Sequence, residues 1–111
     1  MNGRKWILAH NSRPRMTDGV EVTKEKGYYS IYRYIDDWDE EGDSIYCIDE
    51  YVNDIPDMML MLAVGARDDE GVIRWMKKNL VKTESNALYR ITEFLDQHGI
   101  PYTRNTNGIL S

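Results

Sequence analysis

In the first half of the chain, hydrophobic and polar positions follow a two-residue period. The segment "YYSIYRYI" at 28–35 alternates most clearly, and its aromatic and β-branched residues suit a pleated strand. Residues of one parity are predicted to face the core: Tyr29, Ile31, Arg33 and Ile35. The other parity is predicted to form a tyrosine-rich outer face: Tyr28, Ser30, Tyr32 and Tyr34.

Shorter segments around this strand extend the pattern. Residues 5–9 and 20–23 are predicted as strands, and residues 24–27 as a hairpin turn. Residues 10–19 are rich in turn-forming types and are predicted as a loop. Residues 44–52 fit both a strand and a helix face, but their β-branched and aromatic content favours a strand that pairs with the tyrosine-rich one.

From Asp54 onward, the pattern changes to helical spacing. Asp54 is expected to cap a helix that has Pro56 in its first turn. Its segment at 58–64 is apolar nearly all round, which predicts a buried helix. Residues 68–80 begin with acids and end with lysines, the order that a helix dipole favours. Their inward stripe is predicted to comprise Val72, Trp75, Met76 and Leu80.

The clearest helix is predicted over 83–99. Its apolar stripe contains Leu88, Ile91 and Leu95, and Gly99 supplies a stop signal. Residues 102–110 are predicted as a closing hairpin with its turn at Asn107-Gly108 and only a stub of strand beyond it. The expected fold is a single α+β domain over 1–111, with a small antiparallel sheet from the N-terminal half and two to three helices packed on one face.

Composition places this domain in a reducing compartment. A chain of 111 residues is long enough to form its own core, and the lone Cys47 excludes an internal disulfide. The N-terminal apolar run is too short for a signal peptide, and the longest apolar stretch is far below a membrane span. We therefore expect a cytoplasmic protein with no membrane association and no cofactor.

Charge is distributed very unevenly along the chain. Residues 1–34 carry seven Lys/Arg and three acids, a net charge of +4. Residues 35–70 carry one Arg and thirteen acids, a net charge of −12. Residues 71–111 carry six Lys/Arg and three acids, a net charge of +3. These values sum to the net charge of −5. An acidic centre is thus bracketed by two basic flanks, which could neutralise part of it after folding.

The acidic centre resembles a calcium-binding loop in its spacing. Ligand, glycine and apolar positions of such a loop match Asp37, Asp39, Glu41, Gly42 and Ile45. The twelfth position needs a bidentate glutamate but holds Ile48, and a predicted strand stands where an entering helix is required. No metal site is therefore expected, and a solvated hairpin loop is the simpler interpretation.

A second interpretation makes this acidic segment a binding surface. Concentrated carboxylates repel one another, and a partner with a basic surface would be steered to them. The predicted partner-binding residues are Asp36, Asp37, Trp38, Asp39, Glu40, Glu41 and Asp43, with Trp38 as the desolvated anchor. The favoured function is a small acidic, non-enzymatic interaction domain, of the inhibitor or immunity type, that binds a basic protein such as a nuclease.

Two alternatives stay open. Nucleic acid could bind the basic N-terminal residues Arg4, Lys5, His10, Arg13, Arg15, Lys24 and Lys26, although a pI near 5.0 makes this partner less favoured. A carboxylate-based enzyme could use Asp37 and Asp49, but no phosphate-binding glycine loop, metal motif or nucleophile motif is present. A homodimer is also compatible with the tyrosine-rich face or with the apolar segment at 58–64.

Overall fold

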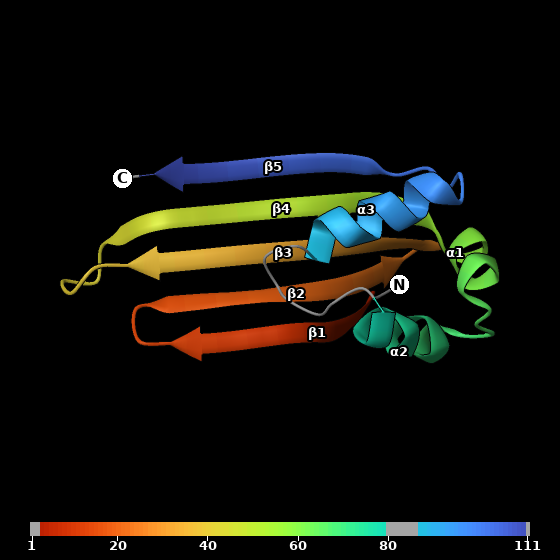
Figure 1. Cartoon of the computed structure of the whole chain (residues 1–111), viewed down its shortest axis with the longest axis horizontal. Helices are drawn as coiled ribbons and strands as arrows, with labels where there is room; N and C mark the ends of the chain where they lie inside the picture. The colour runs from red at the N-terminus through yellow and green to blue at the C-terminus, as the bar shows by residue number, and fades with distance from the viewer. Residues whose placement is uncertain (1–2, 80–86, 111) are drawn as a thin grey trace.

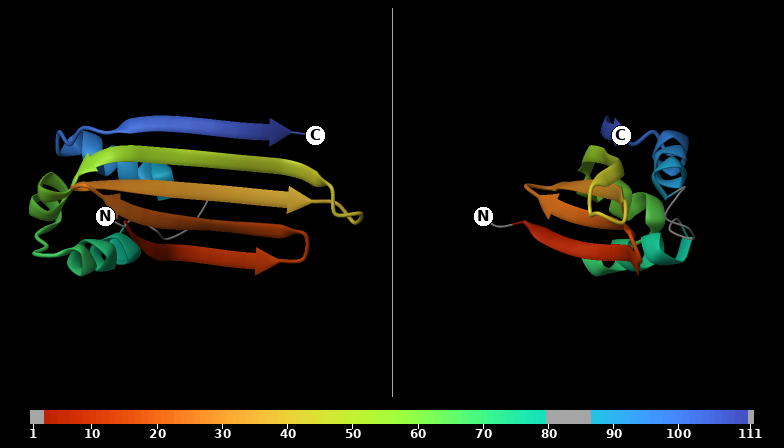
Figure 2. Two further views of the ribbon diagram at one scale, coloured as in Figure 1. Left: turned by 180° about the vertical axis from the view of Figure 1, so that it is seen from behind. Right: turned by 90° about the vertical axis from the view of Figure 1, so that its left-hand side faces the viewer.

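Five strands form one antiparallel sheet in the computed structural model of the chain, which describes residues 3–79 and 87–110. The strands are β1 (Arg4–Arg13), β2 (Met16–Glu25), β3 (Tyr28–Trp38), β4 (Ser44–Pro56) and β5 (Thr103–Leu110). Between β4 and β5 the chain forms α1 (Asp57–Val64), α2 (Asp69–Asn79) and α3 (Ala87–Gln97). The strands pair in sequence order, so β1 and β5 are the sheet edges (Figure 1). The predicted α+β fold is confirmed, with helices on one face of the sheet (Figure 2).

Two tight turns connect the first three strands. The turn at Lys26-Gly27 has positive φ at both residues, 53° and 86°, which is the type I′ geometry favoured in two-residue hairpins, and it confirms the predicted turn over 24–27. Pro14 and Arg15 form the other turn, and Arg15 has a φ of 66° as the third residue of a type II turn requires.

The predicted loop over 10–19 is wrong for most of its length. Asn11 pairs with Asp18 and Ser12 with Thr17, so both strands continue to the turn. These residues favour turns locally but are extended here, because each one pairs with a residue on the neighbouring strand. Local propensity does not account for such pairing.

The core lies between the helices and one half of the sheet. On the sheet it consists of Val20, Val22, Tyr29, Ile31, Val52 and Ile55. The helices contribute Leu60, Val72, Ile73, Met76, Leu88, Ile91 and Leu95. Both predicted faces of β3 are confirmed, although Ile35 is only half-buried because the helices stop short of that end of the sheet (Figure 1). Trp75 is also half-buried, and Leu80 lies outside the described residues.

The start of the first helix differs from its prediction. Residues 44–52 form a strand as favoured, and β4 continues to Pro56, so Asp54 caps no helix. The Asp54 carboxylate instead accepts a hydrogen bond from the Thr103 hydroxyl at 2.9 Å. The predicted burial of 58–64 is wrong as well: Leu60 is buried, whereas Leu62 is 85% exposed, because only one side of α1 contacts the sheet.

The C-terminal prediction is partly right. The stripe of Leu88, Ile91 and Leu95 is buried, and Gly99 follows α3 with a φ of 64°. The predicted hairpin over 102–110 is wrong, because β5 runs without a turn and pairs with β4 along eight residues. An edge of β4 that is distant in sequence supplies the partner, and a two-residue turn signal does not reveal it.

An ion-pair cluster fastens α2 to the sheet. The Asp69 carboxylate accepts hydrogen bonds from Lys24 Nζ at 2.8 Å and from the Tyr29 hydroxyl at 2.6 Å, and Arg4 lies 3.2 Å away. Burial pushes the pKa of Asp69 upward, but the bonds from Lys24 and Tyr29 outweigh it and leave the pKa below its ordinary value. The basic N-terminal strands and the acidic start of α2 thus neutralise each other within the fold.

Candidate functional site

The face of the sheet opposite the helices, here called the open face, has no helix over it in the described part of the chain (Figure 2). Two rows of side chains cross it, because residues paired across antiparallel strands share a face. One row comprises Ile7, Glu21, Tyr32, Tyr51 and Asn105. The other row comprises His10, Gly19, Tyr34 and Asp49.

Three tyrosines form a continuous aromatic group on this face. The rings of Tyr32 and Tyr51 stack with centroids 4.8 Å apart and planes at 17°, and Tyr34 lies 5.4 Å from Tyr32. All three side chains are half-buried although no helix covers them, because each ring shields its neighbour. The result is an amphipathic aromatic surface of the kind enriched at protein interfaces.

Gly19 determines how the Tyr34 ring lies. A Cβ at Gly19 would be 2.5 Å from the Tyr34 hydroxyl oxygen, so only glycine leaves room for the ring to cross β2. The hydroxyl thereby reaches Nδ1 of His10 on β1 at 2.8 Å. The aromatic group therefore extends over the sheet from β4 to β1.

The polar groups between the rings are mainly acceptors. The Tyr32 hydroxyl donates a hydrogen bond to the Asp49 carboxylate at 2.7 Å. The pKa of Tyr32 is raised mainly by burial and also by this carboxylate. Burial together with the negative charges of Glu21 and Asp18 also raises the pKa of Tyr34. One carboxylate oxygen of Asp36 on the same face is buried and has no hydrogen-bond partner. This face is thus negative and rich in neutral phenols, which favours cations.

The predicted partner-binding residues gather at the end of the molecule farthest from α1 and α2 (Figure 1). We call this end, residues 36–45 with the adjoining residues 13–15, the acidic tip. Asp36, Asp37, Trp38 and Asp39 are half-buried there, whereas Glu40, Glu41 and Asp43 are exposed. Six acids against Arg13 and Arg15 give −6 + 2 = −4. The only ion pair within the tip among the described residues is Arg15–Glu40 at 3.4 Å, with both side chains exposed.

Asp39 has a structural role in this loop. Its carboxylate accepts backbone hydrogen bonds from Glu41 at 3.0 Å and Asp43 at 2.9 Å, and its N–H donates to the Asp43 carbonyl. Those bonds occupy the carboxylate that the calcium spacing places at the third position. Within the described residues no three His, Cys, Asp or Glu side chains are grouped to hold a metal ion.

The fold does not bring together the two carboxylates of the enzyme alternative, Asp37 and Asp49. Asp37 lies on the helix side of β3, in register with Tyr46, whereas Asp49 lies on the open face, so the two carboxylates are on opposite sides of the sheet. Cys47 is half-buried, and burial with the nearby Asp49 and Asp36 raises the pKa of its thiol, which disfavours the thiolate.

The basic N-terminal residues are dispersed by the fold. Arg4 and Lys24 pair with α2 acids on the helix side, and Lys5 pairs with Glu21 at 3.1 Å on the open face. Arg13 and Arg15 belong to the acidic tip, where Arg15 pairs with Glu40. These residues do not form a continuous basic surface for nucleic acid, because they lie on opposite faces of the sheet and at different ends of the strands.

Comparison with known proteins assigns the chain to no family: no family model, curated protein or solved structure matches it. In the described residues no helix is long and apolar enough to cross a membrane. The sequence pattern predicts the tyrosine face of β3 but does not reveal that His10 extends it. The pairing of β1 with β2 and of β2 with β3 places His10 beside Tyr34, and the pairing of β3 with β4 places Tyr51 beside Tyr32.

Proposed function

We propose that this protein is a non-enzymatic binding protein whose open face and acidic tip together bind a partner protein with a lysine- and arginine-rich surface. Binding covers this basic surface of the partner and thereby inhibits the activity that requires it. The observation that carries the proposal is the aromatic group of Tyr32, Tyr34 and Tyr51 on the open face, which continues through Asp36 into the acidic tip with its net charge of −4.

The chemistry of this surface selects for cations. A guanidinium or ammonium group over a tyrosine ring gains about 0.5–1 kcal/mol when exposed and about 2 kcal/mol when desolvated. Asp49 and Asp36 supply carboxylates beside the rings, and the exposed acids of the tip steer a basic partner during encounter. Nucleic acid is disfavoured by the same carboxylates, which repel phosphates.

The structure also decides which acids can be reversed without damaging the loop. Asp39 holds the loop through two backbone bonds, so its loss would alter the loop itself. Glu41 and Asp43 are exposed, and their side chains make no ion pair in the described structure. The matched control reverses Glu25 and Glu93, two exposed acids far from the tip. Each double reversal changes the net charge by +4, from −5 to −1.

The test compares the native protein, Glu41→Lys/Asp43→Lys and Glu25→Lys/Glu93→Lys as baits in nuclease-treated host extract. We expect a basic protein to be retained by the native bait and the control but not by the tip variant. Calorimetry with the purified partner should show at least tenfold weaker binding by the tip variant, and by Tyr51→Ala. Equal affinity for all baits, or binding that disappears with nuclease treatment, would reject the proposal.

A further inference from the structure

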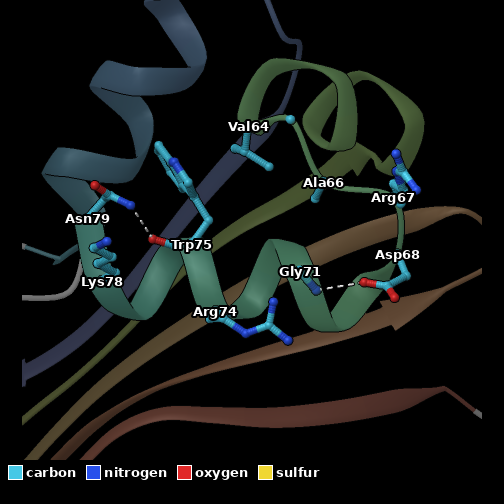
Figure 3. A pocket seen from close by; sticks show the side chains of 10 residues that line it. Val64, Ala66, Arg67, Asp68, Gly71, Arg74, Trp75, Lys78 and Asn79 are labelled. Carbon is cyan, nitrogen blue, oxygen red and sulfur yellow. Dashed lines mark hydrogen bonds between the residues drawn. The ribbon is translucent and has the colours of Figure 1, made fainter.

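A cleft of about 660 Å³ lies between α2 and the connection from α1, at the opposite end of the molecule from the acidic tip (Figures 1 and 3). Apolar groups of Val64, Ala66 and Trp75 contribute to its wall. Its cations are Arg74 and Lys78, one turn apart on α2, and Arg67 on the connection. This volume falls within the range of small-ligand sites, about 300–1,000 Å³.

The three cations of the cleft have no acidic partner among residues 3–79 and 87–110. Arg67, Arg74 and Lys78 form no ion pair with any acid in the described residues, although the chain has nineteen acids and fourteen Lys/Arg. The acid that lines the cleft, Asp68, uses its carboxylate to accept the backbone N–H of Gly71 at 2.8 Å.

The wall of the cleft is held in place by packing. The Trp75 ring lies 4.6 Å from the Phe94 ring on α3 at an interplanar angle of 49°, and Val64 stands at the end of α1. Gly71 allows the connection to approach α2 closely, since a Cβ there would lie 3.1 Å from the Ala66 side chain. A preformed wall of this kind reduces the entropy that a ligand must lose on binding.

We propose that this cleft binds a small organic phosphate, with the phosphate held by Arg74 and Lys78 of α2 and the organic body against Trp75 and Val64. Arginine forms paired, charge-assisted hydrogen bonds to phosphate oxygens, and lysine adds a point charge. A ring or hydrocarbon body would bury the apolar part of the wall. This site does not depend on the proposed partner-binding function, because the cleft shares no residue with the open face or the tip.

Calorimetry with AMP, adenosine, inorganic phosphate and citrate tests the proposal on the full chain. Two charge-matched variants are compared: Arg74→Gln/Lys78→Gln in the cleft, and Lys26→Gln/Lys77→Gln outside it, each of which removes two positive charges. Lys77 shares the last turn of α2 with Lys78 but does not line the cleft. Two-dimensional NMR of the three tryptophan indole groups reports where the ligand lies.

We expect AMP to bind the native chain, to shift the Trp75 indole resonance, and to bind the cleft variant at least tenfold more weakly while the control stays within twofold. Weaker binding by inorganic phosphate is expected, because it lacks an organic body. The proposal is overturned if AMP and inorganic phosphate both fail to bind, if adenosine binds as tightly as AMP, or if citrate is preferred. Equal weakening in both variants would also overturn it, since that result reports net charge alone.

Discussion

Replacing Gly19 with alanine tests whether the aromatic group on the open face depends on a missing side chain. Glycine to alanine in a compatible strand stabilises a protein by about 0.4–1 kcal/mol, because the unfolded chain loses freedom. At Gly19 the new Cβ would lie 2.5 Å from the Tyr34 hydroxyl oxygen, 2.7 Å from its Cζ and 2.8 Å from the backbone oxygen of Ala9. We therefore predict the opposite sign.

The size of the effect follows from these contacts. Moving the Tyr34 ring away breaks its 2.8 Å hydrogen bond to His10, worth about 1 kcal/mol. Displacing the Ala9 backbone is an overpacking strain, which typically costs about 1–3 kcal/mol. We expect a net loss of about 2–3 kcal/mol in the free energy of unfolding. With an unfolding entropy of about 2.1 cal/mol/K per residue, the melting temperature should fall by roughly 10 °C.

Urea unfolding followed by circular dichroism measures this loss, and a double-mutant cycle assigns it. Tyr34→Ala removes two of the three close contacts, so Gly19→Ala should cost less in the Tyr34→Ala background, with a coupling of about 1 kcal/mol or more. The reasoning is refuted if Gly19→Ala is as stable as the native chain. It is equally refuted if the two substitutions are additive, because Tyr34 would then not be the group that Gly19 accommodates.

Three further predictions concern the helix side and the thiol. Asp69→Asn should lower the free energy of unfolding by about 2–3 kcal/mol in urea, because Tyr29 and two cations lose a charged acceptor. Folding lowers the pKa of Asp69, so the contribution of its carboxylate to the free energy of unfolding is complete above about pH 4 and is lost as the pH falls below that value. The free energy of unfolding of Asp69→Asn should therefore decrease less on acidification than that of the native chain. Leu60→Ala should cost about 2–5 kcal/mol and Leu62→Ala under about 0.5 kcal/mol; equal costs would contradict the observed orientation of α1. Iodoacetamide should modify Cys47 at pH 7 more slowly than free cysteine, because its raised pKa reduces the thiolate, and a rate as fast as free cysteine would show the thiol to be activated.

Local pattern determined a large part of this protein. The two faces of β3, the Lys26-Gly27 turn, the buried stripe of α3 and the α+β class follow from alternation, backbone preference and helical spacing, all of which act over a few residues. Local pattern also placed the acidic tip on a hairpin loop, because six acids and a glycine between two strands disfavour burial.

Tertiary pairing decided the rest. Residues 102–110 are predicted as a hairpin, yet they form the single strand β5. They pair with the edge of β4, which is distant in sequence and therefore leaves no signal in the local pattern. Leu62 and Leu60 have equal hydrophobicity, and only the side on which α1 meets the sheet distinguishes the exposed one from the buried one. Tyr51, Tyr32 and Tyr34 become one surface through cross-strand register. The tyrosine surface thus consists of residues whose types are visible in sequence, but whose proximity comes from strand pairing across the sheet; the cleft, by contrast, is formed by α2 and the connection that directly precedes it.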